Sequence, residues 1–101
     1  MTTLVGLDVG TTGVKAVAIS PEGEVLARAE QEYELAIPQP GWSEQDPEDW
    51  WAASERALAA VGAAEASSVG LTGQMHGLVL LDSADRVLWG CLMIVLLAVI
   101  T

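Results

Sequence analysis

Residues 4–19 read LVGLDVGTTGVKAVAI, and this stretch decides the fold. Its two flanks, Leu4–Val9 and Val14–Ile19, are rich in Val, Leu and Ile, which is typical of β-strands. Between them lies a short polar loop with the sequence Gly-Thr-Thr-Gly. Glycine permits positive φ angles and lets a ligand approach the backbone closely. The stretch therefore predicts a strand, a tight loop and a second strand.

The loop has the chemistry of an anion-binding turn. Successive backbone N–H groups in such a turn form a concavity that attracts anions, and Lys15 adds positive charge. Asp8, where the first strand ends, would repel a bare phosphate but suits a phosphate that carries Mg²⁺, since carboxylates, waters and phosphates usually hold that ion. An ordinary hairpin with Asp and Gly as turn residues remains the alternative on local chemistry alone.

Spacing excludes two commoner nucleotide-binding loops. A P-loop needs Gly-x-x-x-x-Gly-Lys-Ser/Thr, whereas Lys15 here follows Val14. The dinucleotide-binding fingerprint opens a helix, whereas Gly10 and Gly13 lie between two β-type segments.

Composition restricts the class of protein and its partners. The chain has 101 residues, of which 51% are hydrophobic, and its 4 basic and 14 acidic residues give a net charge of −10. This indicates one small domain or part of a larger one, with no basic surface for nucleic acid or an anionic membrane. The only cysteine, Cys91, excludes an internal disulfide and a cysteine-based metal site. The N-terminus lacks the cationic start of a secretory signal, so we expect a cytoplasmic protein.

A third strand is predicted from Val25 to Tyr33, after a type I turn at Ser20–Gly23. Apolar residues alternate with charged ones along it, as in a strand with one buried face. Three strands joined by short turns form an antiparallel meander. The first strand is apolar on both sides, so we expect it to be central and covered on both faces.

A helix is predicted to begin at Asp46 and Pro47, which suit the cap and the first helical position, and to end near Gly62 or Ala64. Its apolar residues have helical spacing, so that face should pack on the sheet with the Trp residues in the core. They are Trp50, Ala53, Ala57, Leu58 and Val61. Trp42, in the preceding loop at residues 36–45, is expected to cover the core.

The strand after this helix, Ser67–Gly73, is expected to run parallel to the first strand. In open α/β sheets ligands gather beyond the carboxyl ends of the strands, so Asp8 and His76 would line the same rim. A purely structural histidine is the alternative. Residues 78–89 then read as another hairpin with a polar turn.

Three motifs together carry a family resemblance. They are DVGTTGVK at residues 8–15, GWSEQDP at residues 41–47 followed by two Trp residues, and GQMHG at residues 73–77. The first resembles the phosphate-binding hairpin of the sugar-kinase, actin and Hsp70-like ATPase superfamily. In this order and spacing the three resemble the N-termini of xylulokinases, a branch of the FGGY carbohydrate kinase family, over residues 3–88.

The resemblance implies an α/β fold of the ribonuclease-H-like (actin-like ATPase) type, here as an N-terminal half-domain. It also implies ATP-dependent phosphorylation of a ketopentose, D-xylulose, to its 5-phosphate, with ATP and Mg²⁺ in a cleft between two domains. By motif position, Asp8 would hold Mg²⁺ through water. The implied phosphate contacts are Gly10, Thr11, Thr12, Gly13 and Lys15. The implied sugar contacts are Gln74, Met75 and His76.

The end of the chain departs from the family pattern. Residues 90–100 are wholly apolar, where the family would continue with a polar segment. The uncharged run from Val87 to Ile100 is shorter than the ~20 residues that span a bilayer. We therefore expect a partial kinase domain at residues 1–88 and an atypical tail at 89–101, from a truncated or frame-shifted reading without the family's catalytic aspartate.

Three functional hypotheses follow. The chain is the N-terminal part of a ketopentose kinase, or it belongs to another sugar kinase or a chaperone-like ATPase of the same superfamily, or it is a non-enzymatic fragment or binding module. The Gln-Met-His-Gly segment at residues 74–77 favours a sugar kinase over a chaperone-like ATPase, which needs no sugar contact. The 101-residue chain alone is expected to be inactive.

Overall fold

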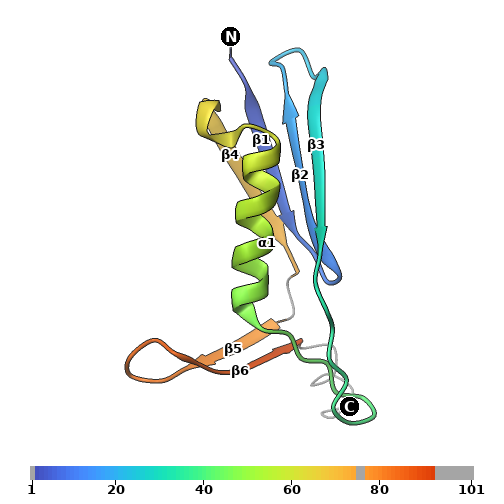
Figure 1. Ribbon diagram of the computed structural model, residues 1–101, viewed down its shortest axis with the longest axis vertical. Helices are drawn as coiled ribbons and strands as arrows, with labels where there is room; N and C mark the ends of the chain where they lie inside the picture. The colour runs from blue at the N-terminus through green and yellow to red at the C-terminus, as the bar shows by residue number, and fades with distance from the viewer. Residues whose placement is uncertain (1, 75–76, 93–101) are drawn as a thin grey trace.

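The computed structural model describes residues 2–74 and 77–92, and it contains a four-stranded mixed sheet with one long helix across one face (Figure 1). Strands β1 (Leu4–Val9), β2 (Gly13–Ile19) and β3 (Val25–Glu32) form an antiparallel meander. Strand β4 (Ser68–Gly73) lies beside β1 and parallel to it, which gives the order β3-β2-β1-β4. The predicted meander, crossover and parallel strand are confirmed.

Helix α1 (Pro47–Ala60) begins where the sequence predicts and ends two residues before Gly62, the earlier of the two predicted ends. The Asp46 carboxylate accepts a hydrogen bond from the Glu48 N–H at 3.0 Å, which satisfies one of the unpaired donors of the first turn. The helix ends before Gly62, which has the left-handed φ of 72° that glycine tolerates well. A short 3₁₀ helix, η1 (Ala63–Glu65), then leads to β4.

The core lies between α1 and the meander. It consists of alternate residues of the first two strands and one stripe of the helix. The buried apolar residues are Val5, Leu7, Val14, Ala16, Ala18, Ala53, Ala57 and Val61. Ala27 and Ala29 of β3 and Tyr33, directly after it, pack against this cluster, on the face that the sequence predicts.

The prediction that the Trp residues lie in the core is wrong. Trp51 is 65% exposed, since it is two positions from Ala53 and therefore on another side of the helix. Trp50 is half-buried and turns its indole N–H toward a glutamine instead of the core. Trp42 is 40% exposed and is not among the side chains that pack on the core. The core-facing stripe of α1 is instead centred on the fully buried Ala53 and Ala57, with Leu58 packed beside them as predicted.

The expectation that β1 is covered on both faces is also wrong for the described residues. Val5 and Leu7 are buried under α1, whereas Asp8 on the opposite face is exposed. Within residues 2–74 and 77–92, α1 is the only helix longer than a single turn, and it covers one face of the sheet. The edge strand β4 is exposed along its whole length, and its Leu71 is 74% exposed.

Strands β5 (Gly77–Leu81) and β6 (Val87–Leu92) form the predicted hairpin, which lies at the end of the sheet where β4 ends and α1 begins (Figure 1). The expected boundary at residue 89 falls inside β6. Residues 93–101, most of the apolar tail, lie outside the described residues. No helix in the described part of the chain is long and apolar enough to cross a membrane.

Candidate phosphate-binding site

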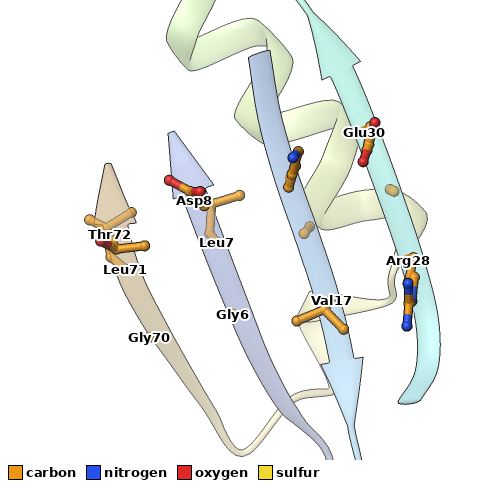
Figure 2. Close-up of a pocket in the computed structure, with 12 residues that line it drawn as sticks. Gly6, Leu7, Asp8, Val17, Arg28, Glu30, Gly70, Leu71 and Thr72 are labelled. Atoms are coloured by element: carbon orange, nitrogen blue, oxygen red, sulfur yellow. The ribbon is translucent and has the colours of Figure 1, made fainter. Parts of the chain in front are cut away.

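Asp8 and Lys15, the charged residues among the predicted metal and phosphate contacts, share the open face of the sheet. Asp8 is the register partner of Lys15 on β2 and of Thr72 on β4. Figure 2 shows Asp8 and Thr72 close to the carboxyl ends of their strands, with Arg28 and Glu30 on β3 across the same face. These side chains line an open pocket of about 590 Å³. Among the described residues Lys15 forms no ion pair, so its ammonium is free to meet an anion.

The loop between β1 and β2 has all of its carbonyl groups engaged. The Gly13 carbonyl accepts from the Gly10 N–H at 2.9 Å. The two carbonyls of the threonines accept from residues far along the chain: that of Thr11 from Gln45 Nε2 at 2.6 Å, and that of Thr12 from the Tyr33 N–H at 3.3 Å. The Tyr33 hydroxyl donates to the Gly10 carbonyl. The acceptors of the loop are therefore turned toward the protein.

The donors of the loop are placed differently. Neither the Thr11 N–H nor the Thr12 N–H has a hydrogen-bond acceptor among residues 2–74 and 77–92. Thr12 is exposed and Thr11 is half-buried, so both donors belong to a surface turn. Two neighbouring N–H groups without a protein acceptor, beside Lys15, form the kind of concavity that binds anions.

Close backbone contacts fix two of the glycines. A Cβ on Gly13 would lie 2.7 Å from a backbone oxygen of β3, and a Cβ on Gly73 would lie 2.6 Å from the Val9 carbonyl oxygen. Distances under 3.0 Å essentially never occur for a real Cβ. Gly13, predicted as a ligand contact, thus has a steric role in seating the loop on β3, and Gly73 lets β4 approach the end of β1.

The predicted sugar segment reaches the phosphate loop. The Gln74 N–H donates to the Val9 carbonyl at 2.9 Å, and Gln74 Oε1 accepts from the Thr11 hydroxyl at 2.7 Å. The structure therefore brings two predicted site residues from different motifs into direct contact. Met75 and His76 lie outside the described residues, so their sugar contacts stay predictions.

Gln45 and Trp50 belong to the site although the sequence did not indicate a role for either. Gln45 is only 7% exposed, and its Oε1 accepts from the Trp50 indole N–H at 3.0 Å. Both side chains line a second pocket of about 450 Å³, together with Gly10, Gln74 and Gly77. A glutamine just before a helix cap is usually exposed, so only tertiary structure could identify it as a buried support.

Tyr33 is the third supporting residue that the sequence missed, because its place on the apolar face of β3 predicted only packing. Burial raises the pKa of its phenol, and the negative charge of Asp8 raises it further. The hydroxyl therefore stays protonated at neutral pH and remains a donor to the Gly10 carbonyl.

The residues fit a Mg²⁺ ion that is held largely by phosphates and water. No group of three or more His, Cys, Asp or Glu residues within the described part of the chain could enclose a metal. Asp8 is a single exposed carboxylate beside the phosphate loop. Mg²⁺ commonly keeps several waters and takes one or two carboxylates plus substrate phosphates, which matches this donor set.

Comparison with known proteins identifies the family. The model of the N-terminal domain of the FGGY carbohydrate kinases matches residues 3–95. The chain belongs to the FGGY family of carbohydrate kinases. The mixed sheet with its crossover helix is accordingly part of the actin-like ATPase fold of these kinases, as the sequence predicts.

Relatives in the FGGY family include kinases with different substrates. The chain is 44% identical over 88 residues to a xylulose kinase of Escherichia coli, and 38% identical over 86 residues to a glycerol kinase of Aquifex aeolicus. These alignments cover 83% and 81% of the chain but 18% of each relative. The crystal structure of a xyloylose kinase from Brucella ovis superposes with a TM-score of 0.80 at 44% identity, over 89% of the chain and 20% of that structure. The chain thus spans about a fifth of the length of these relatives.

Proposed function

We propose that this chain supplies the phosphate-binding hairpin of an ATP-dependent kinase that converts D-xylulose to D-xylulose 5-phosphate. One observation carries the proposal. The loop at residues 10–13 has every carbonyl engaged by the protein, while the Thr11 and Thr12 N–H groups have no acceptor among the described residues. A turn that exposes only its donors suits an anion, and membership of a carbohydrate kinase family supports a nucleotide phosphate as that anion.

Phosphoryl transfer depends mainly on positioning and on stabilising negative charge. In this proposal the N–H groups of Thr11 and Thr12 bind phosphate oxygens, and Lys15 adds a positive charge on the adjoining strand. Mg²⁺, when bound, would neutralise part of the phosphate charge, and Asp8 would hold it through water. Gly10 lets the loop close tightly, since a Cβ there would lie 3.1 Å from the Gly13 carbonyl oxygen, and Gly13 seats the loop on β3.

The sugar is proposed to be a ketopentose that lies beside Gln74. Gln74 Oε1 accepts a hydrogen bond from the Thr11 hydroxyl, and both Gln74 and Gly77 line the 450 Å³ pocket next to the loop. Met75 and His76, between these two residues in the chain, are the proposed sugar contacts. Similarity to the Escherichia coli xylulose kinase favours D-xylulose. The cytoplasm, which supplies ATP, is the proposed location.

A different polyol or sugar is the second candidate, since the Aquifex aeolicus relative is a glycerol kinase. The structure of a gluconate kinase from Lactobacillus acidophilus also superposes with a TM-score of 0.83, at 26% identity. The acceptor is therefore best tested with D-xylulose, glycerol and gluconate in parallel.

A domain exchange tests the proposal. Residues 3–88 of this chain replace the matched segment of the Escherichia coli xylulose kinase, and ADP release is measured with Mg-ATP and each acceptor. We expect release that depends on D-xylulose. A chimera that folds and binds nucleotide but prefers glycerol or gluconate would contradict the substrate, and one that binds no nucleotide would contradict the proposed role of the hairpin.

The 101-residue chain by itself provides the second test. We propose that the base for the attacking hydroxyl lies outside these residues, so the chain alone should show no sugar-dependent ADP release with Mg-ATP and D-xylulose. Release at enzyme-like rates would show that the chain is a complete catalyst.

A further inference from the structure

The N–H groups of Thr11 and Thr12 each belong to a peptide group whose carbonyl accepts a hydrogen bond from a side chain. The N–H of Thr11 belongs to the peptide group whose carbonyl is that of Gly10, and the N–H of Thr12 belongs to the peptide group whose carbonyl is that of Thr11. In a trans peptide the carbonyl and the following N–H lie in one plane and point in opposite directions. A hydrogen bond to the carbonyl therefore sets the direction of the N–H on the other side.

Two side chains make these hydrogen bonds. The Tyr33 hydroxyl donates to the Gly10 carbonyl, so it orients the Thr11 N–H. Gln45 Nε2 donates to the Thr11 carbonyl at 2.6 Å, so it orients the Thr12 N–H. Both come from elements far from the loop in sequence, β3 with its following residue and the segment before α1.

The direction of the Gln45 amide is fixed in turn. An indole N–H can only donate, so the Gln45 atom 3.0 Å from Trp50 Nε1 must be the oxygen. The amide nitrogen then faces the Thr11 carbonyl as a donor. Gln45 is 7% exposed, so water does not readily replace either bond.

We propose that Gln45 and Tyr33 are positioning residues that aim the Thr12 and Thr11 N–H groups, and that Trp50 acts through Gln45. That these donors receive a nucleotide phosphate rests on the function proposed above, whereas the orientation of the loop does not. Neither side chain is required to touch the nucleotide.

The experiment uses the ¹⁵N-labelled 101-residue chain and three variants. Gln45→Met keeps the length of the side chain and removes its hydrogen bonds, and Tyr33→Phe removes only the hydroxyl. Gln31→Met is the matched control, since the Gln31 side chain accepts a hydrogen bond at 3.2 Å from Arg56 Nε and makes none to the loop. Without any ligand, we expect Gln45→Met to shift the amide resonance of Thr12 most and Tyr33→Phe that of Thr11 most, at little change in the melting temperature.

A second readout uses Mg-ATP as the probe. We expect its dissociation constant to rise at least fivefold in Gln45→Met and Tyr33→Phe, with no change in Gln31→Met. Trp50→Phe, which leaves Gln45 in place without its donor, should give a smaller rise. Equal affinity in all variants, with the two loop amides unmoved, would overturn the positioning role.

The two readouts separate this inference from the proposed function. If the original chain binds no Mg-ATP but the amides of Thr11 and Thr12 move as expected, the positioning role stands and the nucleotide is wrong. If the chain binds Mg-ATP and the loop amides do not respond to either variant, the nucleotide stands and the positioning role is wrong. If a variant unfolds, the shift produced by the other one decides.

Discussion

Two turns of this molecule differ in which residues satisfy their polar backbone groups. The loop between β1 and β2 has its carbonyls held by Tyr33 and Gln45, which come from elsewhere in the chain, and it leaves two N–H groups free of protein acceptors in the described structure. The turn between β5 and β6 is closed by one of its own residues. Asp82 Oδ1 accepts from the N–H groups of Ala84 and Arg86 at 2.8 and 2.9 Å.

The second turn is thus self-contained. The Asp82 carbonyl also accepts from the Asp85 N–H at 3.0 Å, and its carboxylate pairs with the Arg86 guanidinium at 2.8 Å. The N–H groups of Ala84 and Arg86 already donate to the Asp82 carboxylate, so they are not available to bind a ligand. In this chain the loop proposed to bind a ligand is supported by residues distant in sequence, whereas the structural turn is closed by its own residues.

The largest expected effect on stability comes from disrupting the close contact between Gly13 and β3. Gly13→Ala places a Cβ 2.7 Å from a β3 backbone oxygen, which forces the hairpin off β3. We expect a loss of about 3 kcal/mol of unfolding free energy, the upper end for overpacking. Chemical denaturation measures it. Gly23→Ala is the control, with open space around the Cβ and only its φ of 91° to strain it, and should cost about 1 kcal/mol.

Removing the carboxylate beside the loop is expected to act on catalysis and not on folding. In the xylulose kinase chimera, Asp8→Ala should lower turnover at least a hundredfold, about 2.7 kcal/mol of transition-state stabilisation, and leave the apparent affinity for D-xylulose nearly unchanged. Steady-state kinetics with Mg-ATP measure both. Turnover close to that of the unmodified chimera would remove Asp8 from the metal site.

Breaking the second turn should remain local. Asp82→Ala removes the acceptor of the Ala84 and Arg86 N–H groups, so these amides should exchange with deuterium faster. The amides of β1 and β2 should keep their exchange rates, and Mg-ATP binding should not change. Weaker nucleotide binding in this variant would show that the two hairpins are coupled and that the second turn is not self-contained.

The smallest expected effect distinguishes the two turns by pH. The Tyr33 phenol has a pKa raised above 10.0, so its contribution to stability is complete below that pH and is lost as the pH rises through the folded-state value. The N–H of Arg86 holds the pKa of Asp82 below 3.8, so the stability from this turn is present above that pH and is lost as the pH falls. The melting temperature should therefore depend less on pH at the alkaline end in Tyr33→Phe, and less on pH at the acid end in Asp82→Ala.

Much of the fold could be predicted from local sequence signals. The meander followed from Val-rich strands and the Ser20–Gly23 turn, and α1 from Asp46 and Pro47. Coverage of the sheet could not be predicted, because apolar strands such as β1 read alike whether one face or both are packed. The Trp residues were misplaced because size and apolarity suggested core, whereas the alanines at 53 and 57 occupy the stripe that faces the sheet.

The candidate site was predictable only in part. One short motif contains Asp8, the loop at residues 10–13 and Lys15, so the sequence alone predicts their chemistry. Gln45 and Tyr33 act through hydrogen bonds over 34 and 23 positions. Nothing in their own neighbourhoods indicates those partners, since a buried polar contact is a property of the folded chain.

An NMR titration of the ¹⁵N-labelled chain with Mg-ATP tests directly whether the first loop binds phosphate through its free donors. If the free donors of the first loop receive the phosphates, the amides of Thr11 and Thr12 shift most and saturate together, while those of Ala84 and Arg86, already bonded to Asp82, stay in place. Saturable binding with the largest shifts in the second turn or elsewhere on the sheet, and none at Thr11 and Thr12, would contradict it.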